Sequence, residues 1–277
     1  MAAAAEPPAR TLARLYCPAP QRSTLAALLG IEAEIRAPLH GGAAHEVAHA
    51  RLQWWREECL RLAAGNPQHP LTRALGEQFP GARRAELCTV GGFVELATWD
   101  LAAATFESRR ELEAYSARWS AALVGPLAHL ALPADGHPRA QALGRRLHEL
   151  ELLNALGPHA RAGWLRLPLA ELAQAEVPPE QLASQPWGPQ LAALVRTRHG
   201  EARAGLALAV AALAPQEQAA LAGLLVWAVL ASAHSHRVLA ALPYARGPGE
   251  HHAVLDGWRA WRAARRAARG RLRLAPR

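Results

Sequence analysis

The stretch best placed to line a ligand site is residues 148–168. One face of the helix expected there carries apolar side chains and an amide at helical spacing, namely Leu147, Leu150, Leu153 and Asn154. The helix is expected to end at Gly157–Pro158. Beyond that break, His159, Arg161 and Arg166 supply polar groups. The pattern predicts a core or ligand-lining face followed by a polar connection.

Acidic residues are too sparse and too badly spaced for a magnesium site on helices. Such a site needs acids at i and i+3 or i+4, so that both reach one ion. The chain has three aspartates, Asp100, Asp135 and Asp256, and no acidic pair spaced by three. The pairs spaced by four are Glu107/Glu111, which fits a helix cap, and Glu176/Glu180, which Pro178–Pro179 interrupts. We therefore expect no metal and no cofactor.

Residues 42–64 predict a helix whose apolar stripe contains Trp55. Arg51 lies one turn before Trp55, and a guanidinium there could bind a diphosphate through bidentate hydrogen bonds. The alternative is a core tryptophan flanked by solvated arginines that pair with Glu57 and Glu58. Because neighbouring helical residues differ by about 100°, we expect Trp55 to be buried and Trp54 to be more exposed.

The elements that must position these residues are helices. Hydrophobic residues make up 51% of the 277 residues, mostly Ala and Leu, and β-branched residues are sparse. This composition favours helix throughout. The longest uncharged apolar run, 219–233, is shorter than the roughly 20 residues that span a bilayer. We expect one all-α domain.

Several segments, in order, resemble the squalene/phytoene synthase family. They are RLQWWREE at 51–58, ELEAY at 111–115, the stretch from Asn154 to Leu167–Pro168, and WRAW at 258–261. The resemblance extends from about Leu12 to Leu272. It implies a single-domain isoprenoid-synthase-like helical bundle around a central cavity. It also implies prenyl diphosphate substrates, which the family joins with Mg²⁺ ions held by aspartates on two facing helices.

The resemblance also assigns residues to the cavity. Arg22 and Glu34 match the first family signature, and Asp100 matches the second acid of a later segment. Arg36, Ala37 and His40 stand where metal-binding aspartates would be, and Gly157–Pro158 replace an Arg-Asp pair. This pattern looks more like the branch that contains the mitochondrial complex I assembly factor. The candidates for the cavity or for diphosphate binding are Arg22, Glu34, Arg51, Trp55, Asp100, Asn154, His159 and Arg161.

Two functions follow from these observations. The first is a non-catalytic relative that holds an isoprenoid lipid, such as a prenyl diphosphate, or a protein partner during assembly. The second is a Mg²⁺-dependent prenyltransferase that condenses two prenyl diphosphates. Diphosphate departure leaves negative charge that metal ions must stabilise. Because the aspartates are missing, we favour the first function and assign no catalytic residue.

The formal charge of +8 comes from the C-terminus. Eight of the 31 basic residues follow Asp256, and the remaining 23 balance 23 acidic residues. The balance argues against nucleic-acid binding. We divide the chain into an unstructured lead-in (1–11), the family domain (12–256) and a basic helix or tail (257–277). That tail carries Trp258 and Trp261, which would contact an anionic membrane surface. The alternatives are that the tryptophans pack on the bundle, that the tail stays in solvent, or that it touches nucleic acid.

Cysteine content indicates the compartment. Cys17, Cys59 and Cys88 are odd in number and show no paired spacing, which favours a reducing environment. The N-terminus MAAAAEPPAR lacks the apolar core of a signal peptide. We expect a cytoplasmic protein that contacts the inner face of the membrane peripherally.

Overall fold

The structure is a computed structural model that describes residues 8–40, 45–244 and 253–275. Within these ranges every regular element is a helix, as the composition predicts. The α-helices are α1 (Pro8–Leu15), α2 (Ala19–His40), α3 (His45–Ala64), α4 (Pro70–Glu77), α5 (Gly92–Leu101), α6 (Arg109–Ala131), α7 (His137–Asn154), α8 (Leu156–Arg161), α9 (Leu169–Gln174), α10 (Pro189–Ala211), α11 (Pro215–Ala220), α12 (Ala222–Ala240) and α13 (Ala253–Ala267).

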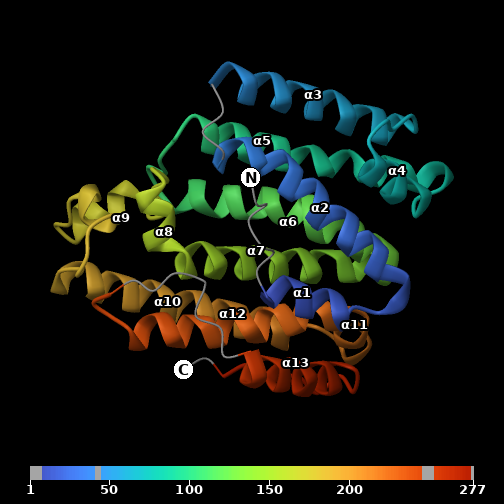
Figure 1. The fold of residues 1–277 in the computed structure, drawn as a ribbon. Coiled ribbons are helices and arrows are strands. Elements are labelled where there is room, and N and C mark those ends of the chain that lie inside the picture. The colour runs from blue at the N-terminus through green and yellow to red at the C-terminus, as the bar shows by residue number, and fades with distance from the viewer. Residues whose placement is uncertain (1–7, 41–44, 245–252, 276–277) are drawn as a thin grey trace.

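The long helices lie side by side in layers (Figure 1). Helix α6 packs against α7, and α7 packs in turn against α10 and α12. Helices α2 and α5 cover the other side of α6, and α3 lies outside α5. Because α6 and α7 are covered on both sides, they form the centre of the core, where Trp119, Leu123, Leu147 and Leu150 are fully buried.

A glycine sets the distance between the two central helices. A Cβ atom at Gly144 of α7 would overlap the Ser120 hydroxyl and Val124 of α6. The absence of a side chain therefore allows the two backbones to approach closely, as small residues do where helices cross. Trp119, one residue before Ser120, consequently lies next to His148 of α7, with their rings stacked 4.5 Å apart.

The predicted unstructured lead-in is wrong for residues 8–11, because α1 begins at Pro8; residues 1–7 lie outside the described residues. Proline fits the first turn of a helix, where its missing N–H has no partner to lose. Ala13 of α1 is fully buried, and α1 packs against α12. This packing gives a short helix the stability that its length alone would not.

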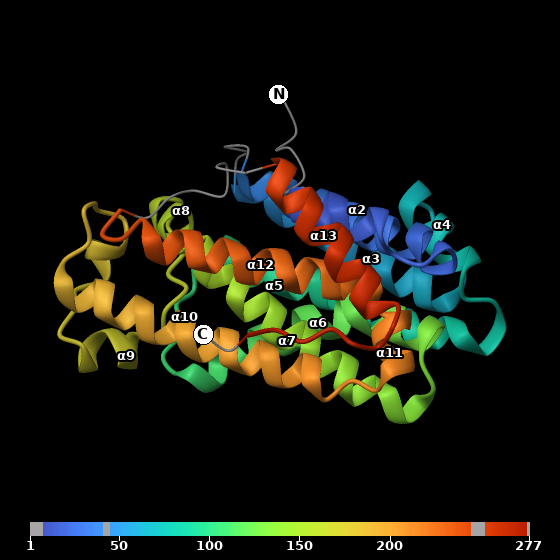
Figure 2. The same ribbon diagram turned by 90° about the horizontal axis from the view of Figure 1, so that it is seen from below.

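Helix α13 lies across α12 and near α11 (Figure 2). It spans the predicted boundary at Asp256, so the basic segment is continuous with the bundle. Ala260, Ala263 and Ala267 form the buried side. The tryptophans do not pack inward, since Trp258 and Trp261 are 53% and 44% exposed. Among the described helices, none has the length and hydropathy needed to cross a membrane.

Candidate functional site

A cavity of about 620 Å³ lies among α1, α2, α7, α8 and α12. Its volume falls within the range of roughly 300 to 1,000 Å³ typical of small-molecule sites. Leucines from four helices form apolar walls, and a polar part carries arginines, histidines and a glutamate. The residues that carry the argument below are Leu12, Leu29, Leu152 and Leu230 on the walls and Arg10, Arg36, His148 and Glu151 in the polar part.

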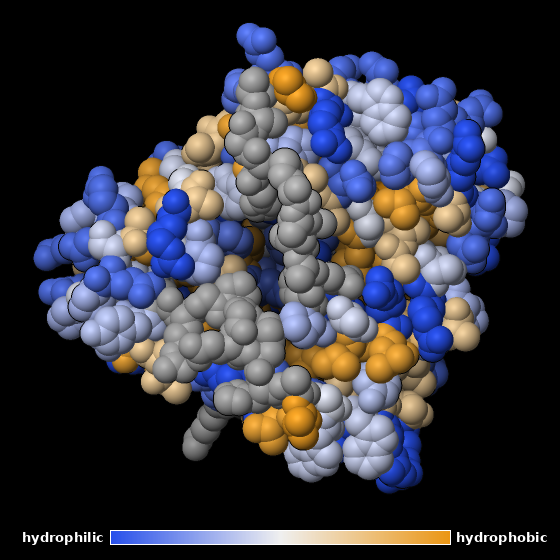
Figure 3. Space-filling view, viewed as in Figure 1, coloured by the Kyte–Doolittle hydropathy of each residue, from blue (hydrophilic) through white to orange (hydrophobic). Residues whose placement is uncertain are grey.

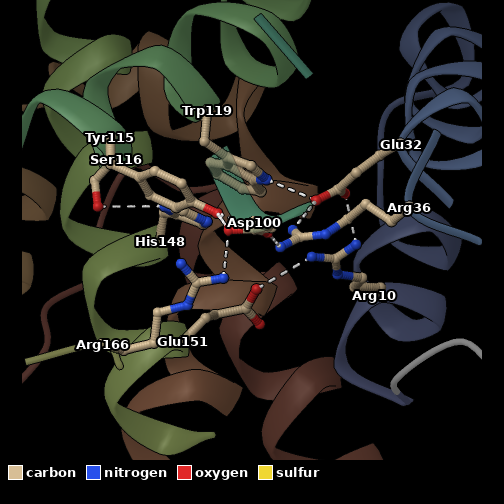
Figure 4. Close-up of polar contacts among 10 residues, drawn as sticks. All are labelled: Arg10, Glu32, Arg36, Asp100, Tyr115, Ser116, Trp119, His148, Glu151 and Arg166. Carbon is tan, nitrogen blue, oxygen red and sulfur yellow. Dashed lines mark hydrogen bonds and ion pairs between the residues drawn. The ribbon is translucent and has the colours of Figure 1, made fainter. Parts of the chain in front are cut away.

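Asp100 is the centre of a buried ion network beside this cavity (Figure 4). Its side chain is fully buried, and its two oxygens accept hydrogen bonds from Arg36 and Arg166, each at 2.6 Å. The Tyr115 hydroxyl lies 2.9 and 3.0 Å from the same oxygens. Because Asp100 is the second-last residue of α5, the helix dipole disfavours its charge. The two guanidinium groups compensate both for that dipole and for burial.

Glu32 of α2 is the second buried carboxylate of the network. It accepts hydrogen bonds from Arg10 at 2.7 Å, Arg36 at 3.4 Å and the Trp119 indole at 2.9 Å. Burial would raise the pKa of Glu32, but Arg10 and Arg36 outweigh burial and hold the pKa below its usual value. The Arg36 guanidinium thus lies between two carboxylates, one on its own helix and one on α5 (Figure 4).

Glu151 of α7 is the third carboxylate and lines the cavity itself. The Trp227 indole donates to it at 2.6 Å, and Arg10 lies 3.5 Å away. Burial raises the pKa of Glu151 despite the nearby Arg10 cation. Arg10 therefore connects α1 to both α2 and α7 through Glu32 and Glu151. Three carboxylates and three arginines balance one another in charge around one wall of the cavity.

The carboxylates of this network do not fit a Mg²⁺ ion. Magnesium requires near-octahedral oxygen ligands and usually takes one or two carboxylates together with substrate phosphates. Each oxygen of Glu32 and Asp100 already accepts a hydrogen bond from an arginine. Within the described ranges, no group of three or more His, Cys, Asp or Glu residues is arranged to hold a metal ion.

Two buried histidines make the stability of the fold depend on pH. Burial, reinforced by nearby arginines, lowers the pKa of His148 well below its usual value and that of His199 to about 4. Below about pH 6.5 the unfolded chain therefore binds more protons than the folded chain. The stability that comes from these two histidines is fully present above that pH and falls as the solution is acidified. Each histidine contributes a slope of up to about 1.4 kcal/mol per pH unit.

We expect the free energy of unfolding in urea to be lower at pH 5.5 than at pH 7.5. The His199→Gln variant should show a shallower fall with acidification, because it removes one of the two groups responsible. Exposed His49 gives a matched variant, His49→Gln, that also removes one histidine. An equal pH dependence in the parent and the His199→Gln chain would contradict the assignment.

Two of the eight predicted site residues line the cavity. Asn154 donates to the Ala231 carbonyl at 3.0 Å, joining α7 to α12, and His159 lies against Trp164 with ring centroids 5.8 Å apart. A third, Asp100, is bonded to the lining residue Arg36. Gly157–Pro158 do not end the helical structure as predicted, because they belong to α8. A proline in the first turn of a short helix costs no hydrogen bond.

The other five candidates do not line the cavity. Exposed Arg22 donates to the Leu15 and Cys17 carbonyls at the end of α1. Arg51 and Glu34 are half-exposed and pair with each other at 3.5 Å between α3 and α2. Trp55 is a core residue, buried as expected, while Trp54 is 39% exposed. Arg161 is exposed on α8. Arg51 and Trp55 belong to α3, which packs against α2, α4 and α5 and contributes no residue to the cavity lining.

Sequence reasoning did not assign Arg10, Glu32, Arg36, Glu151 and Arg166 to the ion network. Arg10 belongs to the segment that was predicted to be unstructured. In the family resemblance, Arg36 stands where an aspartate is expected. One local signal was available, because Glu32 and Arg36 are spaced by four and therefore share a helix face. Their partners on α1, α5 and the segment before α9 lie too far along the chain to be inferred from spacing.

Comparison with known proteins agrees with this architecture. A protein family described as "Squalene/phytoene synthase" matches residues 8–259 of this chain. The fold is similar to a dehydrosqualene synthase crystallised in complex with a ligand, with TM-score 0.73, 18% identity, and coverage of 94% of this chain and 90% of that one. It is also similar to the squalene synthase HpnC from Alicyclobacillus acidocaldarius, with TM-score 0.65, 14% identity, and coverage of 82% and 86% respectively.

No curated protein matches the chain in sequence. At the identities above, the structural similarity establishes the fold alone. It confirms the prediction of an all-α, isoprenoid-synthase-like helical bundle.

Proposed function

The chain belongs to the squalene/phytoene synthase family, and we propose that it is a non-catalytic member that binds an isoprenoid lipid without a metal ion. The observation that carries this proposal is the arginine network. Arg10, Arg36 and Arg166 bind the buried carboxylates Glu32 and Asp100, which would otherwise be the acids available to a cation.

The proposal follows from what the condensation requires. Departure of a diphosphate leaves negative charge, and bound metal ions stabilise it as Lewis acids. In this chain the cations nearest Glu32 and Asp100 are guanidinium groups, whose charge is neutralised by the same carboxylates. Guanidinium groups can donate hydrogen bonds to a headgroup, but they do not act as the Lewis acids that the condensation requires. The alternative, Mg²⁺-dependent condensation of two prenyl diphosphates, therefore has weak support from this site.

The shape and chemistry of the cavity support an isoprenoid as the ligand. Leu29, Leu152 and Leu230 offer apolar surface suited to a prenyl chain. Arg10 and Arg36 face the same space and are 19% and 20% exposed, so a headgroup can contact them. A few placed polar groups within a mainly apolar pocket are typical of ligand sites that fix orientation. The ligand class is an amphiphile with one apolar chain and an anionic or hydroxyl head.

Calorimetric titration with farnesyl diphosphate tests this function. We expect the same dissociation constant with Mg²⁺ and with EDTA, because no metal takes part in binding. Incubation with Mg²⁺ should give no squalene-like or phytoene-like product. Product above a no-enzyme control would overturn the proposal, as would binding that requires Mg²⁺.

A cavity-filling variant locates the binding. Ala33 lines the cavity but is exposed, so Ala33→Trp should occupy the space without disturbing the core. We expect at least a tenfold loss of affinity for farnesyl diphosphate, equivalent to about 1.4 kcal/mol. Exposed Ala50 of α3 provides the matched control, Ala50→Trp, away from the cavity. Equal binding by both variants would place the ligand elsewhere.

A further inference from the structure

Helix α13 presents two chemically different sides. Its inner side consists of the buried Ala260, Ala263 and Ala267 together with Asp256. Arg259 pairs with Asp256, and at about 100° per residue the remaining large side chains fall on the opposite side. They are Val254, Leu255, Trp258, Trp261, Arg262, Arg265 and Arg266, to which we add Arg269, two residues beyond the end of the helix. We call these eight residues the outer face of α13.

The outer face is cationic and holds no acid. Asp256 is the one acidic residue from Ala253 to the C-terminus, and it is buried on the inner side. There it accepts hydrogen bonds from Arg237 at 2.9 Å and from Arg259 at 3.0 Å. Arg262, Arg265, Arg266 and Arg269 form no ion pair with any carboxylate that the structure describes. Their charges are therefore available to an anionic partner.

The apolar residues of this face are exposed beside the arginines. Val254 is 86% exposed, and the two tryptophans are about half exposed. Arg262 stacks on Trp258 at 4.3 Å, and Arg265 stacks on Trp261 at 4.8 Å. In Figure 3, hydrophobic, pale and strongly hydrophilic residues lie side by side at the lower edge, where Figure 1 places α13. Indole rings with basic residues are the combination that anchors helices at membrane interfaces.

The outer face lies next to the cavity. Asp256 from the inner side of α13 lines the cavity, together with Arg237 of α12 and Arg10 of α1. The ion pair between Asp256 and Arg237 fixes α13 against this part of the cavity wall. A surface that binds the outer face is therefore held within one helix diameter of the cavity.

We propose that the outer face of α13 docks on the surface of an anionic lipid bilayer. Charge complementarity favours this partner, because the four arginines of the outer face pair with no carboxylate among the described residues and no acid lies between them. An acidic protein would need a complementary shape, whereas a convex helix with exposed indoles fits the headgroup region directly. If the proposed function holds, docking places the cavity where an isoprenoid can pass between bilayer and protein.

Co-sedimentation of the full chain with vesicles tests the docking. We expect binding to phosphatidylcholine vesicles that contain phosphatidylglycerol, weaker binding as salt is added, and little binding to phosphatidylcholine alone. Each basic residue near an anionic surface strengthens binding about fivefold. The variant that combines Arg262→Gln, Arg265→Gln, Arg266→Gln and Arg269→Gln should therefore bind several hundredfold more weakly.

The matched control makes the same change in net charge elsewhere. Helices α3, α6, α7 and α10 each carry an exposed arginine that pairs with no carboxylate among the described residues. The control variant combines Arg56→Gln, Arg110→Gln, Arg145→Gln and Arg196→Gln. It should bind vesicles almost as well as the parent. Equal losses of vesicle binding in the two variants would overturn the proposal. So would equal binding of the parent chain to vesicles with and without phosphatidylglycerol. Neither result would affect binding of farnesyl diphosphate in the cavity, so the two proposals fail separately.

Discussion

Replacing Asp100 by asparagine is expected to destabilise the fold by about 3 to 5 kcal/mol, the usual cost of removing one partner of a buried ion pair. Asparagine keeps the size of the side chain but removes its charge. Arg166 is 1% exposed and pairs with Asp100 at 2.6 Å, so its cation would be left buried without a carboxylate. The free energy of unfolding of a typical domain is about 5 to 15 kcal/mol. Urea unfolding monitored by circular dichroism measures this loss.

The same helix provides the control. Glu95 of α5 pairs with Arg118 at 2.6 Å, but both side chains are about half exposed. Glu95→Gln should cost less than about 1 kcal/mol, because solvent screens the pair. Combining Asp100→Asn with Arg166→Met removes the unpaired cation and should recover part of the stability. If Asp100→Asn costs no more than Glu95→Gln, the buried network does not stabilise the fold.

Truncation of Trp55 to alanine is expected to cost about 3 to 5 kcal/mol, the usual cost of deleting a buried aromatic side chain. Trp55 is 2% exposed, and its ring centroid lies 4.9 Å from that of His69. The residue therefore connects α3 to the start of α4, and its loss would leave a cavity. The shift of the urea midpoint at constant m-value measures the effect.

The adjacent tryptophan isolates the contribution of burial. Trp54→Ala deletes the same side chain from the same helix at a position that is 39% exposed. It should cost about 1 kcal/mol or less, as surface substitutions generally do. Similar losses of stability at the two positions would mean that burying Trp55 stabilises the fold no more than an exposed tryptophan on the same helix does.

Local patterns in the sequence were sufficient for the helices and the family. The apolar stripe through Leu52, Trp55 and Leu62 predicted which side of α3 is buried, because helical periodicity depends only on nearby residues. Motifs such as RLQWWREE are also contiguous, so they carried the resemblance without knowledge of packing. The missing aspartates could be read directly, since a helical carboxylate clamp needs acids within one turn of each other.

Tertiary structure alone decided what replaced those aspartates. Arg36 and Asp100 are 64 residues apart, and Arg10 and Glu151 are 141 apart, so no periodicity relates them. Packing of α1 on α12 brought Arg10 to the cavity, although the segment before Leu12 carried no strong helical signal. The outward direction of Trp258 and Trp261 likewise depended on which side of α13 the bundle covered. Alanines could approach α12 closely and indoles could not, so the sequence supplied an amphipathic helix and packing selected its buried side.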